Sequence, residues 1–251
     1  MLLSAKYLTN YSIEAKDGNI GQVHSFLFDD QKWIIRYLVV DTGLWLSGRK
    51  VLITPSAIGK PEGQMRVFPV DLNKEEIKKS PDIDTDKPVS REQEQDLHKY
   101  YNWAAYWGGP LGLAVTPLGP IPVEEEEIKE AAEAEEEPQT NHLRSTKEVI
   151  GYSLHAVDGD IGHVDDFIIH QENWLIRYMV VDTSHWLSGR KVIIPPDWIS
   201  KIDWPQAKVI VDVSKEVVKK SPEFNPSAPV NREYEIRLYD YYGRPKYWSS
   251  R

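Results

Sequence analysis

The stretch IRYLVVDTGLWLSGRKVLITP, residues 35–55, returns as IRYMVVDTSHWLSGRKVIIPP at residues 176–196. Extending the match in both directions aligns residues 1–101 with residues 142–242 at a constant offset of 141, and 47 of the 101 aligned positions are identical. Two copies are too few for a solenoid, and each copy has the size of a small domain. The sequence therefore predicts one domain present twice, here named the first and the second repeat.

The repeat divides the chain into three parts. We expect the first repeat with a helical extension at residues 1–107, a linker at 108–141, and the second repeat with its extension at 142–251. The linker is rich in Pro and Gly at its start, and residues 124–137 hold nine Glu and one Lys. Such a composition is typical of a charged, solvated spacer. The alternative is that this acidic tract mimics nucleic acid or recruits a basic partner.

Charge and composition exclude several classes of protein. The net charge is −9, and the acidic tract alone carries −8, so the remainder is close to neutral and no nucleic-acid partner is expected. The chain has no cysteine, which excludes disulfides and thiolate chemistry and fits a cytoplasmic protein. No run approaches the ~18 apolar residues of a transmembrane helix. Peripheral association with a membrane complex is compatible with this composition.

The front part of each repeat has β character. The pairs Asp17-Gly18 and Asp158-Gly159 are typical of tight hairpin turns. Apolar residues after these turns depart from strict alternation, which indicates a bulged or bent strand. Short strands joined by Gly, Pro and Asp turns favour a small antiparallel barrel, because closure removes exposed sheet edges. In the first repeat, strands are expected at residues 20–28, 34–41, 48–53 and 65–70.

The back part of each repeat is predicted to be helical. Short helices are expected at 73–79 and 214–220, with Asn73 and Ser214 as N-caps. Second helices follow N-caps at Ser90 and Asn231. In the first repeat, Leu97, Tyr100 and Tyr101 share one helical face, which should pack on the barrel or on the other repeat. The residues proposed to pack between the repeats are Tyr100, Tyr101, Trp103, Tyr241 and Tyr242.

Identity between the repeats is uneven. Residues 41–50 keep eight of ten identities, whereas residues 61–70 keep one. One interpretation is a paired recognition surface, because Trp and Arg are typical interface anchors. The alternative is a tight turn in which Trp caps the core, Arg pairs with Asp41 or Asp182, and a Gly supplies a positive φ. The proposed surface consists of Trp45, Arg49, Lys50, Trp186, Arg190 and Lys191.

Metal binding and catalysis find weak support. The hairpin of the second repeat offers oxygen and nitrogen ligands for a cation, although solvated turn residues explain it better. No His is shared between the repeats, and no known nucleophile, phosphate-loop or zinc motif is present. We therefore expect no enzymatic activity, no cofactor and no metal, with weak cation-ligand candidates at Asp158, Asp160, His163, Asp165 and Asp166.

The pattern GxxIGxVxxFxx followed by WxIRYxVVDTxxWLSGRKVxIxP resembles the PRC-barrel domain, over about residues 5–80 and 146–221. That family includes the cytoplasmic domain of the photosynthetic reaction-centre H subunit, and a related barrel ends a ribosome-maturation factor. The resemblance implies a small β-barrel of about six strands that docks on larger assemblies, and it supplies no catalytic residues. The chain lacks the transmembrane helix of the former and the accompanying domain of the latter. The trailing segments at 102–107 and 243–248 resemble extensions of stand-alone bacterial tandem members.

These observations predict a mainly β protein in which two small antiparallel PRC-type barrels, each followed by short helices, pack as a pseudo-dimer. The expected function is that of a non-enzymatic assembly or adaptor module that binds a protein or complex. Binding of a small ligand or cation by the acidic hairpin of the second repeat is the alternative. An enzyme with a site between the repeats is the least favoured.

Overall fold

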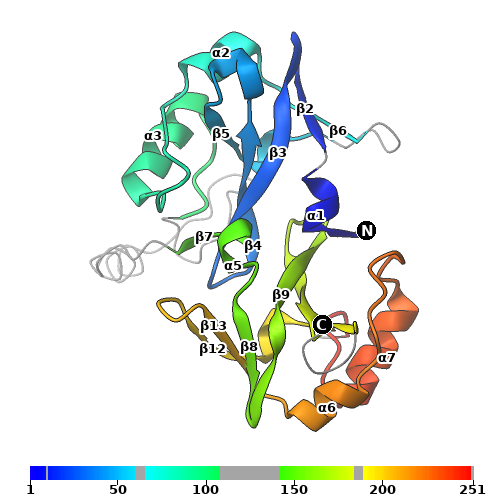
Figure 1. Ribbon diagram of the computed structural model, residues 1–251. Coiled ribbons are helices and arrows are strands. Elements are labelled where there is room, and N and C mark those ends of the chain that lie inside the picture. Colours follow the sequence, from blue (N-terminus) through cyan, green and yellow to red (C-terminus); the bar gives the residue numbers. More distant parts are fainter. Residues whose placement is uncertain (10, 60–65, 108–141, 184–188, 250–251) are drawn as a thin grey trace, which may run out of the picture.

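The computed structural model describes residues 1–9, 11–59, 66–107, 142–183 and 189–249, and the predicted linker lies outside them. The first repeat forms the upper part of the molecule in Figure 1 and the second repeat the lower part. Each repeat contributes the main body of one β-sheet, with two helices after its last strand. The chain is thus mainly β with two sheets, and the predicted strand-to-helix order is confirmed in both repeats.

The first sheet has the hydrogen-bonded order β5-β4-β3-β2-β6. Its helices begin at the predicted Asn73 and Ser90 caps, each with a reciprocal capping box. The elements of the first repeat are β1 (Leu2–Ser4), α1 (Ala5–Leu8), β2 (Ser12–Ala15), β3 (Gly18–Asp29), β4 (Ile34–Asp41), η1 (Gly43–Leu46), β5 (Lys50–Ile53), η2 (Pro55–Ala57), β6 (Val67–Pro69), α2 (Lys74–Lys79) and α3 (Arg91–Tyr101).

The second sheet has the order β11-β10-β9-β8-β13-β12. The elements of the second repeat are β7 (Leu143–Ser145), α5 (Thr146–Val149), β8 (Ser153–Ala156), β9 (Gly159–His170), β10 (Ile176–Asp182), β11 (Lys191–Ile194), η4 (Pro196–Trp198), β12 (Ile199–Asp203), β13 (Lys208–Val211), α6 (Lys215–Lys220) and α7 (Arg232–Tyr242).

The long strand β3 organises the first sheet. Its register with β4 shifts after Val23 and again after Leu27, which confirms the predicted bulges. Five of the eight residues of β4 are buried and three are half-buried. Its sequence is nearly continuous and β-branched, which is typical of a strand that is covered on both faces. One edge of β3 pairs with β4, and the other pairs with β2 in its first half and with β7 in its last three residues. Strand β9 has the equivalent neighbours in the second repeat.

The strand pairings do not form the closed antiparallel barrels that the sequence predicted. In the described residues, no ladder joins β5 to β6 or β11 to β12, and β2–β6 and β8–β13 are parallel pairs. After β5 and β11, a 3₁₀ turn containing Pro55 or Pro196 redirects the chain. Proline has no N–H to donate, so the ladder cannot run on through this corner. Each sheet is therefore curved but open.

The two repeats exchange their N-terminal strands. Strand β1 pairs antiparallel with the end of β9, from Leu2 opposite His170 to Ser4 opposite Ile168. Strand β7 pairs with the end of β3 in the same register displaced by 141 residues, from Leu143 opposite Asp29 to Ser145 opposite Leu27. Figure 1 shows β1 and α1 beside β9, and β7 and α5 beside the first sheet. Each sheet therefore includes a strand from the other half of the chain.

Two retained tryptophans lie where the repeats meet. Trp33 and Trp174 both have a positive φ, of 56° and 57°, which is unusual for a bulky residue. The N–H of Ile176 donates to the carbonyl of Trp33 (2.7 Å), and the N–H of Ile35 donates to the carbonyl of Trp174 (2.9 Å). The strained backbone thus points each carbonyl at the other repeat.

One hydrophobic core runs through both repeats. Rings of the first repeat contact rings of the second, with Phe28 and Phe167 at 5.9 Å and Phe68 and Trp174 at 5.8 Å between centroids. A smaller cluster lies between the first sheet and α3, and it includes Leu143 from β7. Shared burial of this kind couples the stability of the two repeats.

Candidate functional site: the retained loop and the polar clusters behind it

The retained loop after β4 is a rigid turn. Its 3₁₀ helix η1 ends at Ser47 and Gly48, which have φ of 53° and 79°. The Thr42 hydroxyl donates to the carbonyl of Arg49 at 2.6 Å, and Thr183 donates to that of Arg190 at 2.7 Å. The predicted positive φ at Gly48 is confirmed, and Gly189 has φ of 71°. These bonds fix the turn from within.

Both retained arginines bind main chain of their own repeat. Arg49 donates through its guanidinium to the carbonyls of Lys78, Ser80 and Pro81, at 2.7–3.0 Å. Arg190 donates to the equivalent carbonyls at the end of α6. Carbonyls at a helix C-terminus have no partner within the helix, so a guanidinium satisfies them well. The carboxylate next to Arg49 is Asp82, at 3.1 Å, rather than the predicted Asp41.

The other residues of the proposed recognition surface are also engaged. Lys50 pairs with Asp86 at 2.6 Å, and Lys191 pairs with Asp165 at 2.6 Å. Trp45 is half-buried, with the ammonium of Lys74 5.6 Å from its ring centroid. The remaining predicted member, Trp186, lies outside the described residues.

The aromatic residues predicted to pack between the repeats make contacts within their own repeat. The hydroxyl of Tyr100 donates to Glu76 of α2, and that of Tyr241 donates to Val217 of α6, so both tie helices of their own repeat. Both rings remain about 40% exposed. A further pair, Tyr101 and Trp103, stacks at 4.3 Å. In the second repeat, the ring contacts of Tyr242 are with Trp198 and Tyr241. Tyr101, Trp103 and Tyr242 also pack against the hydrophobic core that both repeats share.

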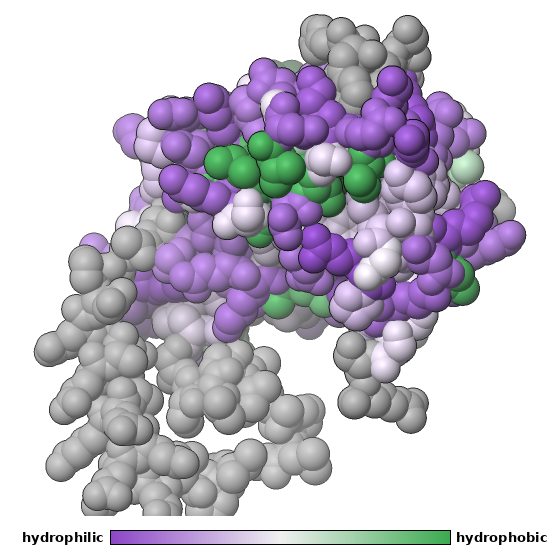
Figure 2. Space-filling model, turned by 90° about the horizontal axis from the view of Figure 1, so that it is seen from below, coloured by the Kyte–Doolittle hydropathy of each residue, from purple (hydrophilic) through white to green (hydrophobic). Residues whose placement is uncertain are grey.

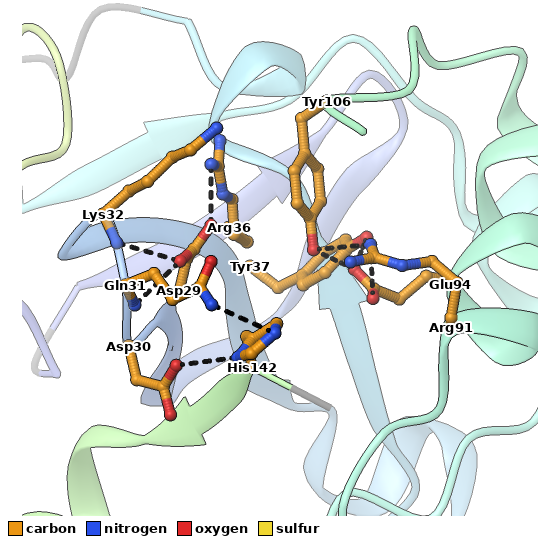
Figure 3. A network of polar contacts seen from close by, with 10 residues as sticks. All are labelled: Asp29, Asp30, Gln31, Lys32, Arg36, Tyr37, Arg91, Glu94, Tyr106 and His142. Atoms are coloured by element: carbon orange, nitrogen blue, oxygen red, sulfur yellow. Dashed lines mark hydrogen bonds and ion pairs between the residues drawn. The ribbon is translucent and has the colours of Figure 1, made fainter. Parts of the chain in front are cut away.

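A buried carboxylate in α3 was not anticipated from the sequence. Glu94 accepts a hydrogen bond from the hydroxyl of Tyr37 on β4 (2.9 Å), one from Tyr106, and one from Arg91 (2.9 Å). The hydroxyl of Tyr37 also lies 2.7 Å from Nε2 of His98. Figure 3 shows Tyr37, Tyr106 and Arg91 converging on Glu94 from the strand, the extension and the helix. The buried face of α3 is therefore Glu94, Leu97 and His98.

The second repeat builds the same cluster. Glu235 accepts from Tyr178 (2.7 Å) and Tyr247 (2.9 Å), and it pairs with Arg232 at 3.0 Å. The position of His98 is taken by Tyr239. Arginines on β4 and β10 lie over the extension tyrosines, Arg36 at 4.0 Å and Arg177 at 4.2 Å from the ring centroids.

The electrostatics of this cluster favour a structural role. Burial raises the pKa of Tyr37 and of Tyr178 far above the usual range, so both hydroxyls stay protonated and act as donors. Burial also raises the pKa of Glu94, against the hydrogen bond from Tyr106 and the charge of Arg91. Donors from a strand, a helix and an extension thus meet on one carboxyl group. The arrangement fixes α3 and its extension on β4.

A signal for the cluster was present in the sequence. Arg91, Glu94 and Tyr106 are identical at the aligned positions of the second repeat, as are Arg36 and Tyr37. A Glu surrounded by polar residues in a helix nevertheless resembles a solvated surface position. Its burial depends on a tyrosine 57 residues away in the chain.

Replacing Glu94 by Ala should destabilise the chain by about 3 kcal/mol, because it leaves buried hydroxyls without an acceptor and Arg91 without its carboxylate. The matched control is Glu92→Ala, an exposed position on the same helix, which should change stability by less than about 0.5 kcal/mol. Urea denaturation followed by tryptophan fluorescence measures both. Equal stability of the two variants would contradict the role given to Glu94.

The carboxylates of the acidic hairpin in the second repeat are bonded to other groups of the same chain. Asp158 accepts from the N–H of Lys215 (2.7 Å), and Asp160 pairs with His155. Asp165 lies between two ammonium groups, and buried Asp166 accepts from Ser4 and from the N–H of Lys6. The remaining candidate, His163, is on β9 and is also engaged. Within the described ranges, no three His, Asp or Glu side chains are grouped to hold a metal ion.

Polar groups of the second repeat also contact the β3–β4 turn of the first. His142 lies 3.2 Å from Asp30, and Arg144 donates to the other oxygen of that carboxylate at 3.1 Å. Asp29 accepts from Arg36 and from the N–H groups of Gln31 and Lys32, each at 3.0 Å. Figure 3 shows this group beside the Glu94 cluster. The Asp30 group connects the two repeats, and the Glu94 group lies within the first repeat.

The comparison with protein families agrees with this geometry. The family model of the PRC-barrel domain matches residues 145–218, from β7 to α6. The match lies in the second repeat and covers 74 of the 251 residues. No curated protein matches the chain. In the part of the chain that the structure describes, no helix has the length and apolarity needed to cross a membrane.

Proposed function

We propose that this chain is a non-enzymatic assembly module, in which two open PRC-type β-sheets, one from each repeat, form an intramolecular pseudo-dimer and present loops to a protein partner. The observation that carries the proposal is the tip of η1. Leu44 is 100% exposed there, beside half-buried Trp45 and Leu46, on a turn whose backbone is fixed. A rigid apolar tip loses little conformational entropy when it binds, which suits an interface anchor.

The retained basic residues take a different part in this proposal. Because Arg49 and Arg190 hold the ends of α2 and α6, they support the loop instead of meeting the partner. Replacing them would perturb the fold together with any surface. The apolar tip is therefore the sharper probe of docking.

The alternatives receive less support. The carboxylates that the sequence offered as cation ligands in the second repeat are paired with Lys, His and main-chain partners. The buried tyrosines and glutamates form a closed set of hydrogen bonds that joins helix to sheet. Neither arrangement favours catalysis, so we keep the non-enzymatic role as a proposal. A cytoplasmic location, which the absence of cysteine fits, is a separate proposal.

A second apolar area provides a useful comparison. Figure 2, which views the lower end of the molecule, shows hydrophobic groups gathered between hydrophilic ones. The β8–β9 turn and α6 lie at this end in Figure 1, and their exposed apolar residues are Val157 (67%) and Val217 (37%). A partner that docks on η1 should be insensitive to changes here.

The wild-type chain, used as bait, should capture a protein partner from native cell extract, and the variant Leu44→Asp should not retain that partner. Burying one leucine contributes about 1.5–3 kcal/mol, so binding should weaken about tenfold or more. Val157→Asp is the matched control, since it adds the same charge to an exposed apolar position away from η1. Quantitative mass spectrometry of the captured proteins compares the three baits. A partner held equally by wild type and Leu44→Asp would remove the tip from the proposed surface.

A further inference from the structure

The two repeats have different residues at one equivalent position, an aspartate in the second repeat and a histidine in the first. In the second repeat, the carboxylate of Asp165 lies between two ammonium groups, 2.7 Å from Nζ of Lys6 and 2.6 Å from Nζ of Lys191. Lys6 comes from the other repeat and Lys191 from β11. Burial would raise the pKa of Asp165, but the two lysines hold it below the usual range. One carboxylate therefore pairs with two cations at this point of the joint.

The first repeat keeps both lysines and lacks the carboxylate. Its equivalent positions are Lys147 on α5, Lys50 on β5 and His24 on β3. Nε2 of His24 lies 3.3 Å from Nζ of Lys147. Burial, with the charges of Lys147 and Lys50, lowers the pKa of His24, so the imidazole is neutral at pH 7. Among the described residues, the imidazole of His24 stands at this point in place of the carboxylate of Asp165.

The neighbouring residue changes in the same sense. Ser25 stands where the second repeat has the buried Asp166. The first repeat has thus replaced two adjacent carboxylates by neutral side chains, while the lysines around them are kept. Lys50 compensates through Asp86, whose side chain is 80% exposed. An exposed pair of this kind contributes about 0–1 kcal/mol, so a better-placed anion can displace it.

A pocket lies at the same place. It has a volume of about 470 Å³ and is lined by residues of both repeats, among them His24, Lys50, Arg144, Ser145 and Lys147. Four of the lining side chains are Lys or Arg, and two are Asp or Glu. Three of the four cations pair with carboxylates, Lys50 with Asp86, Lys87 with Asp84 and Arg144 with Asp30, and Lys147 contacts His24. The volume is within the range of about 300–1,000 Å³ that small-molecule sites have. The pocket therefore combines space with two lysines whose equivalents bind a carboxylate in the other repeat.

We propose that this pocket between the repeats binds the carboxylate group of a small-molecule acid, in the place that Asp165 occupies in the second repeat. The ligand carboxylate would accept from the ammonium groups of Lys147 and Lys50, as Asp165 accepts from Lys6 and Lys191. The site is independent of docking at η1, because its residues face the joint between the repeats. Carboxylate is chosen over phosphate because the chain itself places a carboxylate between the equivalent lysines.

The test is a titration of the full-length chain with succinate, monitored by NMR of the histidine ring protons at constant ionic strength. We expect the signals of His24 to shift with saturation in the millimolar range and those of His155 to stay in place. The bound anion should also raise the pKa of His24, because a nearby negative charge favours the protonated imidazole. The charged groups that already act on His24 from neighbouring elements are Lys147, Lys50, Asp41 and Asp86.

Two variants make the test specific. The variant His24→Asp places an internal carboxylate at this position, as in the second repeat, so it should fold normally and bind no succinate. Because the variant has no His24 signal, succinate binding is measured by calorimetry. Lys147→Met removes one charge-assisted hydrogen bond and should weaken binding about tenfold or more. Thermal melting confirms that both variants are folded.

Three results would overturn the proposal. The first is the absence of any His24 shift with succinate up to about 50 mM, far above the expected dissociation constant. The second is unchanged succinate binding by folded His24→Asp. The third is an equal effect of chloride, or a stronger effect of inorganic phosphate, because either would show that the pocket does not select a carboxylate.

Discussion

Replacing Gly21 by Ala should destabilise the chain by about 3 kcal/mol or more, and Gly162→Ala should do the same in the second repeat. A Cβ on Gly21 would lie 2.0 Å from the carbonyl oxygen of Asp41, and one on Gly162 would lie 2.0 Å from that of Asp182. The obstructing atoms are backbone atoms of the neighbouring strand, so no side chain can move aside. Both glycines also have a φ near 140°.

The matched control separates the clash from the backbone angle. Gly48 has a φ of 79°, and a Cβ there would meet nothing within 4 Å. Gly48→Ala should therefore cost only about 1–2 kcal/mol, the usual cost of a left-handed conformation for an L-residue. Urea unfolding of the three variants gives the comparison. If Gly21→Ala were no less stable than Gly48→Ala, the close approach of β3 to the end of β4 would be wrong.

The second large effect concerns the joint between the repeats. When a protease site placed in the linker at residues 108–141 is cut, the two halves should stay together and elute as the intact chain. Each half completes its sheet with a strand from the other, and the rings of Phe28 and Phe167 are packed across the joint. Separation would expose apolar surface and leave two strand ends without hydrogen-bond partners.

Size-exclusion chromatography at micromolar concentration, with a denaturing gel to confirm cleavage, measures this outcome. The cut chain should separate into halves only under denaturing conditions. A matched comparison uses the cut chain without residues 1–4, which lacks β1 and should dissociate more readily. Two separate peaks for the cut chain with an intact N-terminus would contradict the shared core and the proposed pseudo-dimer.

Local pattern was sufficient for most elements. The caps at Asn73, Ser90, Ser214 and Asn231 start helices where predicted, because capping depends on residues three positions apart. The continuous β-branched run at residues 34–41 forms a buried strand for a similarly local reason. Turn signals such as Asp17-Gly18 also act over a few residues. The repeat itself, and the family resemblance in its second copy, are likewise visible without coordinates.

Three features were decided only by the tertiary structure. The exchange of β1 and β7 is a pairing between segments more than 100 residues apart, and three-residue strands carry almost no pattern of their own. Burial of Glu94 requires Tyr37 and Tyr106 to arrive from other elements. The role of Arg49 as a clamp on α2 depends on where that helix ends in space.

The sequence by itself thus determined the duplicated β-rich unit, its helical caps and the match of its second repeat to the PRC-barrel family, because these depend on neighbours along the chain. The tertiary structure decided how the repeats share strands, which charged groups are buried and why one pair of lysines keeps an internal carboxylate while its counterpart does not. Those features depend on free energies of burial and pairing between distant residues, which become defined only when the chain is folded.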